Sequence, residues 1–218
     1  MGRPKQFLDL LGCPVLSYTL RAFEEASEVA RVYVVGDRDR VEGLVREYGI
    51  SKYAGCAPPG ESCSLSTRNG LALLEEDPLT IVLVHDGARC LLTPDLIRRV
   101  VTSISEPGVD GVVPALPVSD TIKVAEDGTV TETLDRARLH AVQTPQAFRF
   151  GAFRNLHAGP AERLRAATDD ASLVERAGGS VLLVEGERTN IKLTTPEDLV
   201  LAEAILNARA GMRLGAPS

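Results

Sequence analysis

Hydrophobic positions follow two different periods along the chain. Residues 14–27 (PVLSYTLRAFEEAS) place apolar side chains at roughly helical spacing, with Pro14 near the start, where a helix tolerates proline. RVYVVG (31–36) and TIVLVHD (80–86) are instead short, nearly continuous apolar runs, as in strands covered on both faces. Helices that alternate with such strands predict a doubly wound, mostly parallel α/β sheet.

The same alternation extends over most of the chain. Further helices are predicted at RDRVEGLVREYG (38–49), SLSTRNGLALLEED (64–77), TPDLIRRVVTSIS (93–105, capped by Thr93), TDDASLVERAG (168–178) and TPEDLVLAEAILNARA (195–210), with another strand at SVLLVEGE (180–187). Ligands of doubly wound sheets bind at the carboxyl ends of strands. HDGAR (85–89), directly after a buried strand, is therefore the first place to expect chemistry.

Residues 118–143 have a different pattern, in which polar and apolar residues alternate. The segment contains Asp127-Gly128, a preferred dipeptide for a tight hairpin turn. We expect a β-hairpin arm that stands off the main sheet of a single domain spanning residues 1–218. Because a two-stranded ribbon is marginal alone, we expect the arm to pack on a second subunit and form a homodimer.

Composition excludes several classes of protein. The chain has 218 residues, 44% of them hydrophobic, which is enough for a substantial core. It shows neither a secretion signal nor an apolar run long enough to cross a bilayer, so we expect a cytoplasmic protein without a membrane partner. The four cysteines and three histidines lack zinc-ligand spacing. A net charge of −6 with dispersed basic residues argues against nucleic acid as a partner.

Asp86 and Gly87 follow the predicted strand at 80–86. The glycine lets the chain turn sharply and leaves the carboxylate facing the crevice. One carboxylate in such a place suits Mg²⁺ that is otherwise coordinated by water and phosphate oxygens. A cap on the following turn explains the same residue equally well.

PPGESCSLSTRNG (58–70) joins a Pro-Gly loop to a serine-rich helix start that includes Ser64 and Ser66. Free N–H groups at a helix N-terminus and small hydroxyls can bind phosphate or the edge of a base. Most junctions of this kind are only helix caps, so the signal is weak by itself.

Five cations have settings that distinguish them from ordinary surface groups: Lys5, Arg89, Lys123, Arg136 and Lys192. Each by itself is more typical of a solvated surface side chain. Several cations that converge on strand ends would fit a doubly anionic, phosphate-bearing ligand.

Six segments together resemble the 2-C-methyl-D-erythritol 4-phosphate cytidylyltransferase family of the non-mevalonate isoprenoid pathway. They are GRPKQFLDLLGCPVL, VHDGAR, DTIK, DRARLHAVQTPQAF, TDDASLVE and NIKLTTPEDLVLAE, in the family's order and over nearly the whole chain. The resemblance implies a Rossmann-like nucleotidyltransferase. Its reaction joins CTP to 2-C-methyl-D-erythritol 4-phosphate, a sugar-alcohol phosphate, and gives 4-diphosphocytidyl-2-C-methyl-D-erythritol and pyrophosphate.

The resemblance also implies roles for residues. Lys5 and Lys192 match catalytic cations, and Lys5 would stabilise charge at the α-phosphorus during in-line attack. Asp86 would hold the Mg²⁺ that bridges the triphosphate. Such transfer relies on positioning and electrostatics, which agrees with the lack of a nucleophile–base pair in the sequence.

The remaining matches concern the two substrates. Gly60 and Ser66 match positions that contact cytosine and ribose, and Asp86 with Gly87 completes the nucleotide set. Positions around the sugar phosphate are matched by Arg89, Thr121, Arg136, Thr144 and Lys192. In the family the arm crosses a dimer, so Thr121 and Arg136 would serve the neighbouring subunit's site.

The chain departs from the family pattern at several places. Gly87 and Cys90 alter the usual VHDAARP, and Cys63 stands where an arginine usually precedes the serine equivalent to Ser66. The family's initial strand and AAGxGxRM loop are represented only by Met1-Gly2. We expect the DNA just upstream to encode both in frame, because the missing strand belongs in the middle of the sheet, where its loss would expose two hydrogen-bonding edges.

Two rival functions remain open from the sequence. A ribitol 5-phosphate cytidylyltransferase shares the fold and the QTPQ stretch, although Lys123 and the LHAVQTPQ surroundings favour methylerythritol phosphate. A truncated, non-catalytic binding or regulatory subunit is the other alternative. It is disfavoured because the downstream constellation is otherwise intact.

Overall fold

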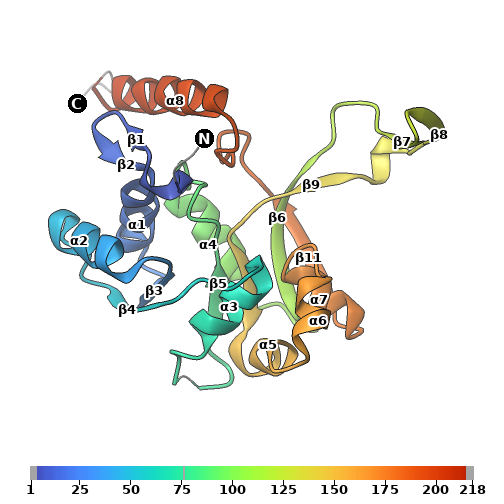
Figure 1. Cartoon of the computed structure of the whole chain (residues 1–218), viewed down its shortest axis with the longest axis horizontal. Coiled ribbons are helices and arrows are strands. Elements are labelled where there is room, and N and C mark those ends of the chain that lie inside the picture. The colour runs from blue at the N-terminus through green and yellow to red at the C-terminus, as the bar shows by residue number, and fades with distance from the viewer. Residues whose placement is uncertain (1–3, 76, 215–218) are drawn as a thin grey trace.

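Eleven strands and eight α-helices make up the computed structural model, which describes residues 4–75 and 77–214 (Figure 1). The strands are β1 (Asp9–Leu10), β2 (Cys13–Pro14), β3 (Val32–Val35), β4 (Tyr53–Ala57), β5 (Ile81–Val84), β6 (Gly111–Pro117), β7 (Lys123–Glu126), β8 (Thr129–Thr133), β9 (His140–Val142), β10 (Gln146–Arg149) and β11 (Val181–Glu185). The helices are α1 (Val15–Glu25), α2 (Arg38–Tyr48), α3 (Cys63–Leu71), α4 (Pro94–Ser103), α5 (Phe150–His157), α6 (Ala161–Arg165), α7 (Ala171–Arg176) and α8 (Pro196–Leu214), with 3-10 turns η1 (Lys5–Phe7) and η2 (Arg136–Arg138).

Several helices predicted from the sequence begin or end on the expected signals, but α3 ends at Leu71, before its predicted end at residue 77. Thr93 accepts a hydrogen bond from the N–H of Leu96 and caps α4, and Asp37 caps α2 in the same way. Gly49 ends α2 in the left-handed conformation with φ 64°, which costs glycine little. Local sequence therefore supplies the cap at each of these boundaries.

The predicted α/β fold is confirmed, and its central sheet is mixed. The strand order is β11-β6-β10-β5, and β9 also pairs with β6. β11 runs parallel to β6, whereas β10 lies antiparallel to both β6 and β5. The sequence patterns did not predict β4, β6 or β10, because a proline in β6 and the small residues of β4 obscure the strand signal.

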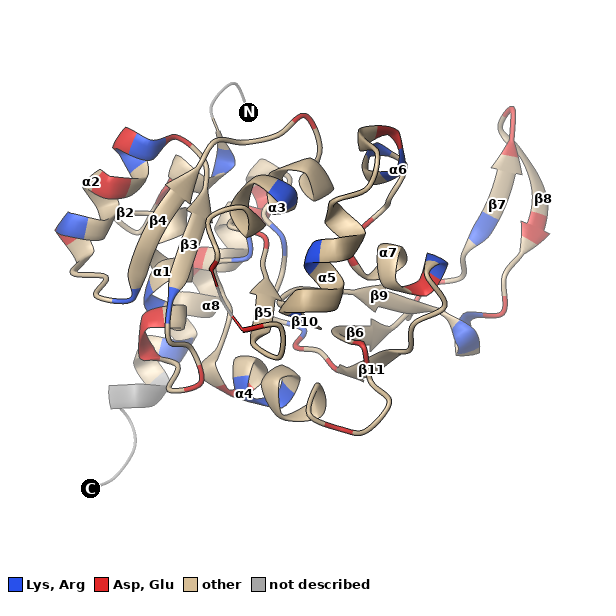
Figure 2. Ribbon diagram, turned by 90° about the horizontal axis from the view of Figure 1, so that it is seen from below, with Lys and Arg blue, Asp and Glu red and all other residues tan. Residues whose placement is uncertain are grey.

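Two hydrophobic clusters cover opposite faces of this sheet. Adjacent residues of β6 separate to the two faces, as strand geometry requires: Val112 joins the cluster formed with α1 and α4, and Val113 joins the one formed with α5 and α7. The same alternation sends Ala147 and Phe148 of β10 to opposite faces. Figure 2 shows α4 and the α5–α7 group on the two sides of the sheet.

The parallel pair β3–β4 forms a sheet separate from the one that contains β5. Within the described ranges, β5 pairs only with β10 and β3 only with β4. The segment Met1–Arg3, which carries the remnant of the expected glycine-rich loop, lies outside the described residues.

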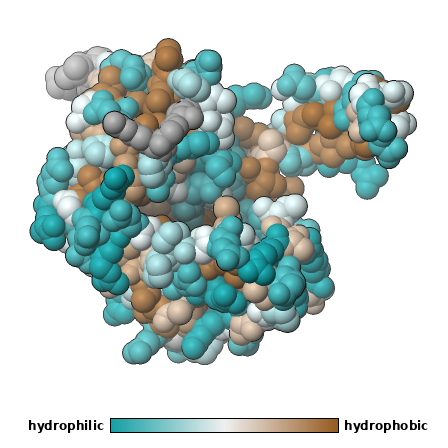
Figure 3. Space-filling model, in the orientation of Figure 1, coloured by the Kyte–Doolittle hydropathy of each residue, from teal (hydrophilic) through white to brown (hydrophobic). Residues whose placement is uncertain are grey.

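The hairpin of β7 and β8 projects from the rest of the chain (Figure 1). Asp127 and Gly128 have φ values of 48° and 78°, as a tight turn of this type requires. Apolar side chains on it are exposed, among them Val124 and Val130, which is 56% exposed. Figure 3 shows hydrophobic surface on the projecting arm.

The described part of the chain contains no helix that is long and apolar enough to span a membrane.

The first turn of α8 is stabilised by a carboxylate that reaches back beyond the helix start. Asp198 accepts hydrogen bonds from the N–H groups of Thr194 and Thr195, each 2.7 Å long, and from the Thr194 hydroxyl. These bonds lower the pKa of Asp198 to about 2. The stabilisation is therefore complete above the ordinary carboxyl pKa near 3.8 and is lost as the pH falls through 2.

We predict that Asp198→Ala lowers the free energy of unfolding by about 1 kcal/mol at pH 7, as for other lost caps. The difference from the wild type should shrink between about pH 4 and pH 2. Urea denaturation across this pH range measures it. Glu197→Ala on the same exposed turn is the matched control, and an Asp198→Ala effect that stays constant down to pH 2 would contradict the assignment.

Candidate active site

The register between β5 and β10 places Thr144 beside Asp86. Val84 lies opposite Gln146 in this antiparallel pair. Continued by two residues, the same register brings Asp86 opposite Thr144. The Asp86 N–H donates a 3.1 Å hydrogen bond to Thr144 Oγ1. A strand end and a loop that are 58 positions apart thus form one surface.

His85 orients the Thr144 hydroxyl through a hydrogen bond. Its Nε2 lies 3.1 Å from the carbonyl oxygen of Arg89, and its Nδ1 lies 3.0 Å from Thr144 Oγ1. A carbonyl only accepts, so Nε2 carries the proton, and Nδ1 accepts from the Thr144 hydroxyl. Loss of contact with water lowers the pKa of His85 to about 4, which favours the neutral ring that this arrangement requires.

Two cations contact the same oxygen of Asp86. Lys192 Nζ lies 3.1 Å and Arg89 Nε 3.4 Å from Asp86 Oδ2. The Arg89 side chain is only 13% exposed, whereas that of Lys192 is 44% exposed. Burial lowers the pKa of Arg89, and the charge of Asp86 opposes that shift.

Backbone carbonyls hold the rest of the Arg89 guanidinium. Nη1 donates to the carbonyl oxygen of Asn190 at 2.8 Å, and Nη2 to that of Val142 at 3.4 Å. The buried Asn190 in turn donates through Nδ2 to the carbonyl oxygen of Thr144 at 2.8 Å. Arg89 is thus a fixed positive charge, while the more exposed Lys192 is free to adjust to a ligand.

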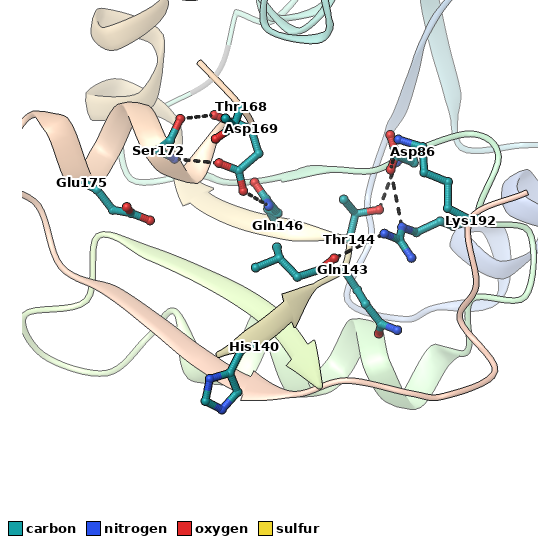
Figure 4. Close-up of a pocket in the computed structure, with 12 residues that line it drawn as sticks. Asp86, His140, Gln143, Thr144, Gln146, Thr168, Asp169, Ser172, Glu175 and Lys192 are labelled. Atoms are coloured by element: carbon teal, nitrogen blue, oxygen red, sulfur yellow. Dashed lines mark hydrogen bonds and ion pairs between the residues drawn. The ribbon is translucent and has the colours of Figure 1, made fainter. Parts of the chain in front are cut away.

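A cavity of about 530 Å³ opens beside these groups (Figure 4). It is lined by Asp86, Arg89, His140, Val142, Gln143, Thr144, Gln146, Thr168, Asp169, Ser172, Glu175 and Lys192. In Figure 4 Asp86 and Lys192 lie at one end, and Asp169, Ser172 and Glu175 lie at the other. The cavity therefore combines a cationic end with an end rich in hydroxyl, amide and carboxylate groups.

Four residues predicted from the sequence line this cavity together: Asp86, Arg89, Thr144 and Lys192. Gly87 adjoins it, and its carbonyl oxygen accepts a hydrogen bond from Thr19 Oγ1 at 3.3 Å. The other predicted site residues, Lys5, Gly60, Ser66, Thr121 and Arg136, are not among its lining residues.

Gly60 and Ser66 form a compact unit of their own at the start of α3. The Gly60 N–H donates to Ser66 Oγ at 2.9 Å, and Ser62 caps the helix through the Leu65 N–H. A Cβ on Gly60 would lie 2.7 Å from the backbone carbon of Leu65 and 2.8 Å from the Ser66 nitrogen. Only glycine fits so close an approach of loop and helix.

The two predicted residues of the arm segment are not among those that line the cavity of their own chain. Thr121 and Arg136 are both exposed, and Arg136 Nη1 donates to the carbonyl oxygen of Ser119 at 2.7 Å. Lys5 lies half-buried in η1, which packs beside α1.

Several polar lining residues of the cavity have no role predicted from the sequence, including Gln146, Thr168, Asp169 and Ser172. Gln146 Nε2 donates to Asp169 Oδ2 at 2.9 Å, and the Ser172 N–H donates to Asp169 Oδ1 at 3.0 Å. The available signal was TDDASLVE, in which two consecutive aspartates precede a helix. Aspartates at this position are also typical of an ordinary helix N-terminus, so the pattern does not by itself indicate a binding site.

Asp86 is the residue whose chemistry fits a divalent cation. Both ion pairs use Oδ2, which leaves Oδ1 for a metal. No group of three or more His, Cys, Asp or Glu side chains gathers as a metal site in the part of the chain that the structure describes. One carboxylate suits Mg²⁺ that takes its other ligands from phosphates and water.

The chain is similar to known proteins over nearly its full length. A family model described as 2-C-methyl-D-erythritol 4-phosphate cytidylyltransferase matches residues 1–208. The protein of that name from Rubrobacter xylanophilus is 63% identical over 209 residues, which cover 96% of this chain and 90% of that protein. The one from Pelotomaculum thermopropionicum is 46% identical over 212 residues, with coverages of 95% and 88%.

Solved structures give the same result for the fold. The crystal structure of 2-C-methyl-D-erythritol 4-phosphate cytidylyltransferase from Thermus thermophilus aligns with a TM-score of 0.76 at 34% identity and covers 94% of each chain. The enzyme of that name from Francisella tularensis aligns with a TM-score of 0.82 at 27% identity and covers 93% of each chain.

The tight approach at Gly60 yields a stability prediction. Gly60→Ala should lower the free energy of unfolding by about 1–3 kcal/mol, because the added methyl group overlaps the backbone of α3. Gly43→Ala in α2 is the control. It has open space around its Cβ position and should be neutral or stabilising by up to about 1 kcal/mol. Equal effects of the two changes in urea denaturation would show that the close approach is not rigid.

Proposed function

Since the chain belongs to the 2-C-methyl-D-erythritol 4-phosphate cytidylyltransferase family, we propose that the cavity at Asp86 binds the sugar phosphate of its reaction. The chain is a nucleotidyltransferase of the non-mevalonate isoprenoid pathway. It joins CTP and 2-C-methyl-D-erythritol 4-phosphate to give 4-diphosphocytidyl-2-C-methyl-D-erythritol and pyrophosphate.

The two ends of the cavity support this placement. Its cationic end, with Arg89 and Lys192, attracts the phosphate. The opposite end, with Gln146, Asp169 and Ser172, offers hydrogen-bonding partners for a hydroxylated chain. The sugar phosphate therefore lies with its phosphate towards Asp86 and its hydroxyl groups towards α7.

The reaction needs few groups besides cations and hydrogen-bond donors. A phosphate oxygen of the sugar phosphate attacks the α-phosphorus of CTP, the new P–O bond forms, and the bond to the pyrophosphate leaving group breaks. Lys5 and Lys192 stabilise the negative charge that spreads over the phosphoryl oxygens. Arg89, which backbone carbonyls hold in place, orients the attacking phosphate.

The nucleotide is assigned to the neighbouring loop and strand end. Gly60 and Ser66 form a closely packed surface at the start of α3, where the cytosine and ribose bind. Asp86 and Gly87 lie next to the triphosphate. Asp86 would hold Mg²⁺, which would supply positive charge to neutralise the triphosphate.

The arm is proposed to complete the site of a second subunit in a homodimer. Thr121 and Arg136 are exposed and are not among the residues that line the cavity of their own chain. The exposed Val124 and Val130 of the hairpin offer apolar surface for a partner chain. Arg136 of one subunit then contributes positive charge to the sugar phosphate bound by the other. The cytoplasm, where CTP is available, is the proposed location.

The two alternatives raised by the sequence are not favoured. The curated relatives at 63% and 46% identity carry the methylerythritol phosphate name, which argues against ribitol 5-phosphate as the preferred substrate. The grouping of Asp86, Arg89, Thr144 and Lys192 at one cavity argues against a non-catalytic subunit.

The proposed role of Asp86 predicts a kinetic defect. The wild type should release pyrophosphate from CTP, Mg²⁺ and 2-C-methyl-D-erythritol 4-phosphate, with higher kcat/KM than with ribitol 5-phosphate. Asp86→Asn should lower kcat by about 100-fold or more, because it removes the charge that holds the metal. Asp95→Asn, an exposed acid of α4, is the control. An Asp86→Asn enzyme with wild-type kcat would refute the assignment.

Mixing two defective variants tests whether the arm acts across subunits. Arg136→Ala alone should mainly raise KM for the sugar phosphate, and Asp86→Ala alone should abolish turnover. At low sugar phosphate, co-refolded mixtures should recover up to about a quarter of wild-type activity, because each mixed dimer contains one complete site. A mixture of Asp86→Ala with Lys192→Ala serves as the control. Both residues line the cavity of their own chain, so no site in the mixed dimer is complete. Recovery no greater than the activity of Arg136→Ala alone would show that the arm serves its own chain.

A further inference from the structure

Asp170 does not line the cavity, and it does not belong to the segment from Gly60 to Ser66 at the start of α3, called the nucleotide loop below. Its neighbours Asp169 and Thr168 line the cavity, but Asp170 is only 6% exposed and its carboxylate points elsewhere. Oδ2 accepts a 2.9 Å hydrogen bond from Thr67 Oγ1 of α3, and Oδ1 lies 3.0 Å from His157 Nε2 of α5. One carboxylate thus joins the start of α7 to α5, which is nearby in sequence, and to α3, which is 103 positions away.

His157 is held as firmly as its partner. It is 1% exposed, its Nδ1 donates to the carbonyl oxygen of Phe153 at 3.0 Å, and its ring lies 4.3 Å from that of Phe153. Because a carbonyl only accepts, Nδ1 carries a proton, and Nε2 and Asp170 share a further hydrogen. The ring therefore has no freedom to turn away from Asp170.

Thr67 is directly next to Ser66, whose hydroxyl accepts the hydrogen bond from the Gly60 N–H. The same loop has a second contact with the region around Asp170, since Arg165 Nη2 lies 2.6 Å from Glu61 Oε2. On the other side, Gln146 donates to Asp169, and its Oε1 accepts from the Ala171 N–H at 3.2 Å. Hydrogen bonds and adjacent residues thus connect Gln146 and Asp169, which line the cavity, to the nucleotide loop.

We propose that Asp170 is a positioning residue that fixes the nucleotide loop of α3 relative to the sugar-phosphate cavity, through its bond to Thr67. The inference rests on the proposed assignment of Gly60 and Ser66 to the nucleotide. Burying a carboxylate and an imidazole is costly, and apolar residues of similar volume often stabilise a core at least as well. What the polar group provides instead is one defined distance and direction between α3 and residues 168–172, because a hydrogen bond tolerates little displacement.

In-line transfer explains why this distance matters. The attacking phosphate is held by the cavity, and the nucleotide by the loop, so the reacting atoms meet correctly only if the two surfaces keep their spacing. Releasing α3 from Asp170 should therefore weaken CTP binding and slow turnover, while the sugar-phosphate cavity stays intact through Gln146 and Asp169.

The test compares Thr67→Val, which removes only the hydroxyl, with Thr67→Ser, which retains it. Thr67→Val should raise KM for CTP and the calorimetric Kd for CTP with Mg²⁺ about tenfold and lower kcat, with less than about a twofold change in KM for the sugar phosphate. Thr67→Ser should restore CTP binding to within about twofold of the wild type.

Val100→Ala controls for lost stability, because Val100 lies in the separate core cluster of α1 and α4. It should lower the melting temperature without changing KM for CTP. Wild-type Kd and KM for CTP in Thr67→Val, or an equal CTP defect in Thr67→Ser or Val100→Ala, would overturn the role of Asp170. If the wild type itself fails to turn over the two substrates, the proposed function is wrong, whereas a turnover-competent wild type with unaltered variants refutes only the positioning role.

Discussion

The antiparallel pairing of β5 with β10 is the constraint on which the rest of the site depends. With Val84 opposite Gln146, Asp86 and Thr144 meet at one end of the pair, and Gln146 faces the cavity two residues further on. Side chains alternate along a strand, so a shift of one residue would turn both Thr144 and Gln146 away from their partners. The buried Phe148 and Ala147, on opposite faces of β10, oppose such a shift.

The charges around Asp86 differ in mobility, and this difference suits a transfer reaction. Arg89 is desolvated and held by the carbonyl oxygens of Asn190 and Val142, so its charge is in place before a substrate arrives. Lys192 is more exposed, and within the part of the chain that the structure describes it is bonded only to Asp86. Fixed charges stabilise a transition state without reorganising, while a flexible ammonium can follow a phosphate as it moves.

The cavity and the loop of Gly60 and Ser66 lie on different elements, and residues 168–172 connect them. Asp169 belongs to the cavity, and Asp170 belongs to a buried group with His157 and Thr67. Two consecutive acids thus bond to different partners, Asp169 at the cavity and Asp170 in the core. The proposed positioning role gives a reason for a polar cluster in a core where apolar packing would cost less desolvation.

Local sequence alone determined much of this protein. Helix limits such as Thr93 and Gly49 and the strand before Asp86 follow from short-range physics, namely capping, backbone freedom and apolar periodicity. The family was also evident, because six motifs kept their order. Asp86, Arg89, Thr144 and Lys192 were identified in this way before the structure brought them to one cavity.

Only the tertiary structure decided what these residues contact. β10 and its antiparallel register were not predicted, because its pairing depends on partners in β6 and β5 that are far away in the sequence and that no local pattern specifies. Gln146 and Asp169 were missed for the same reason, since their chemistry appears only when β10 and α7 lie side by side. The sequence thus determined which chemical groups are present, and long-range pairing decided which of them meet.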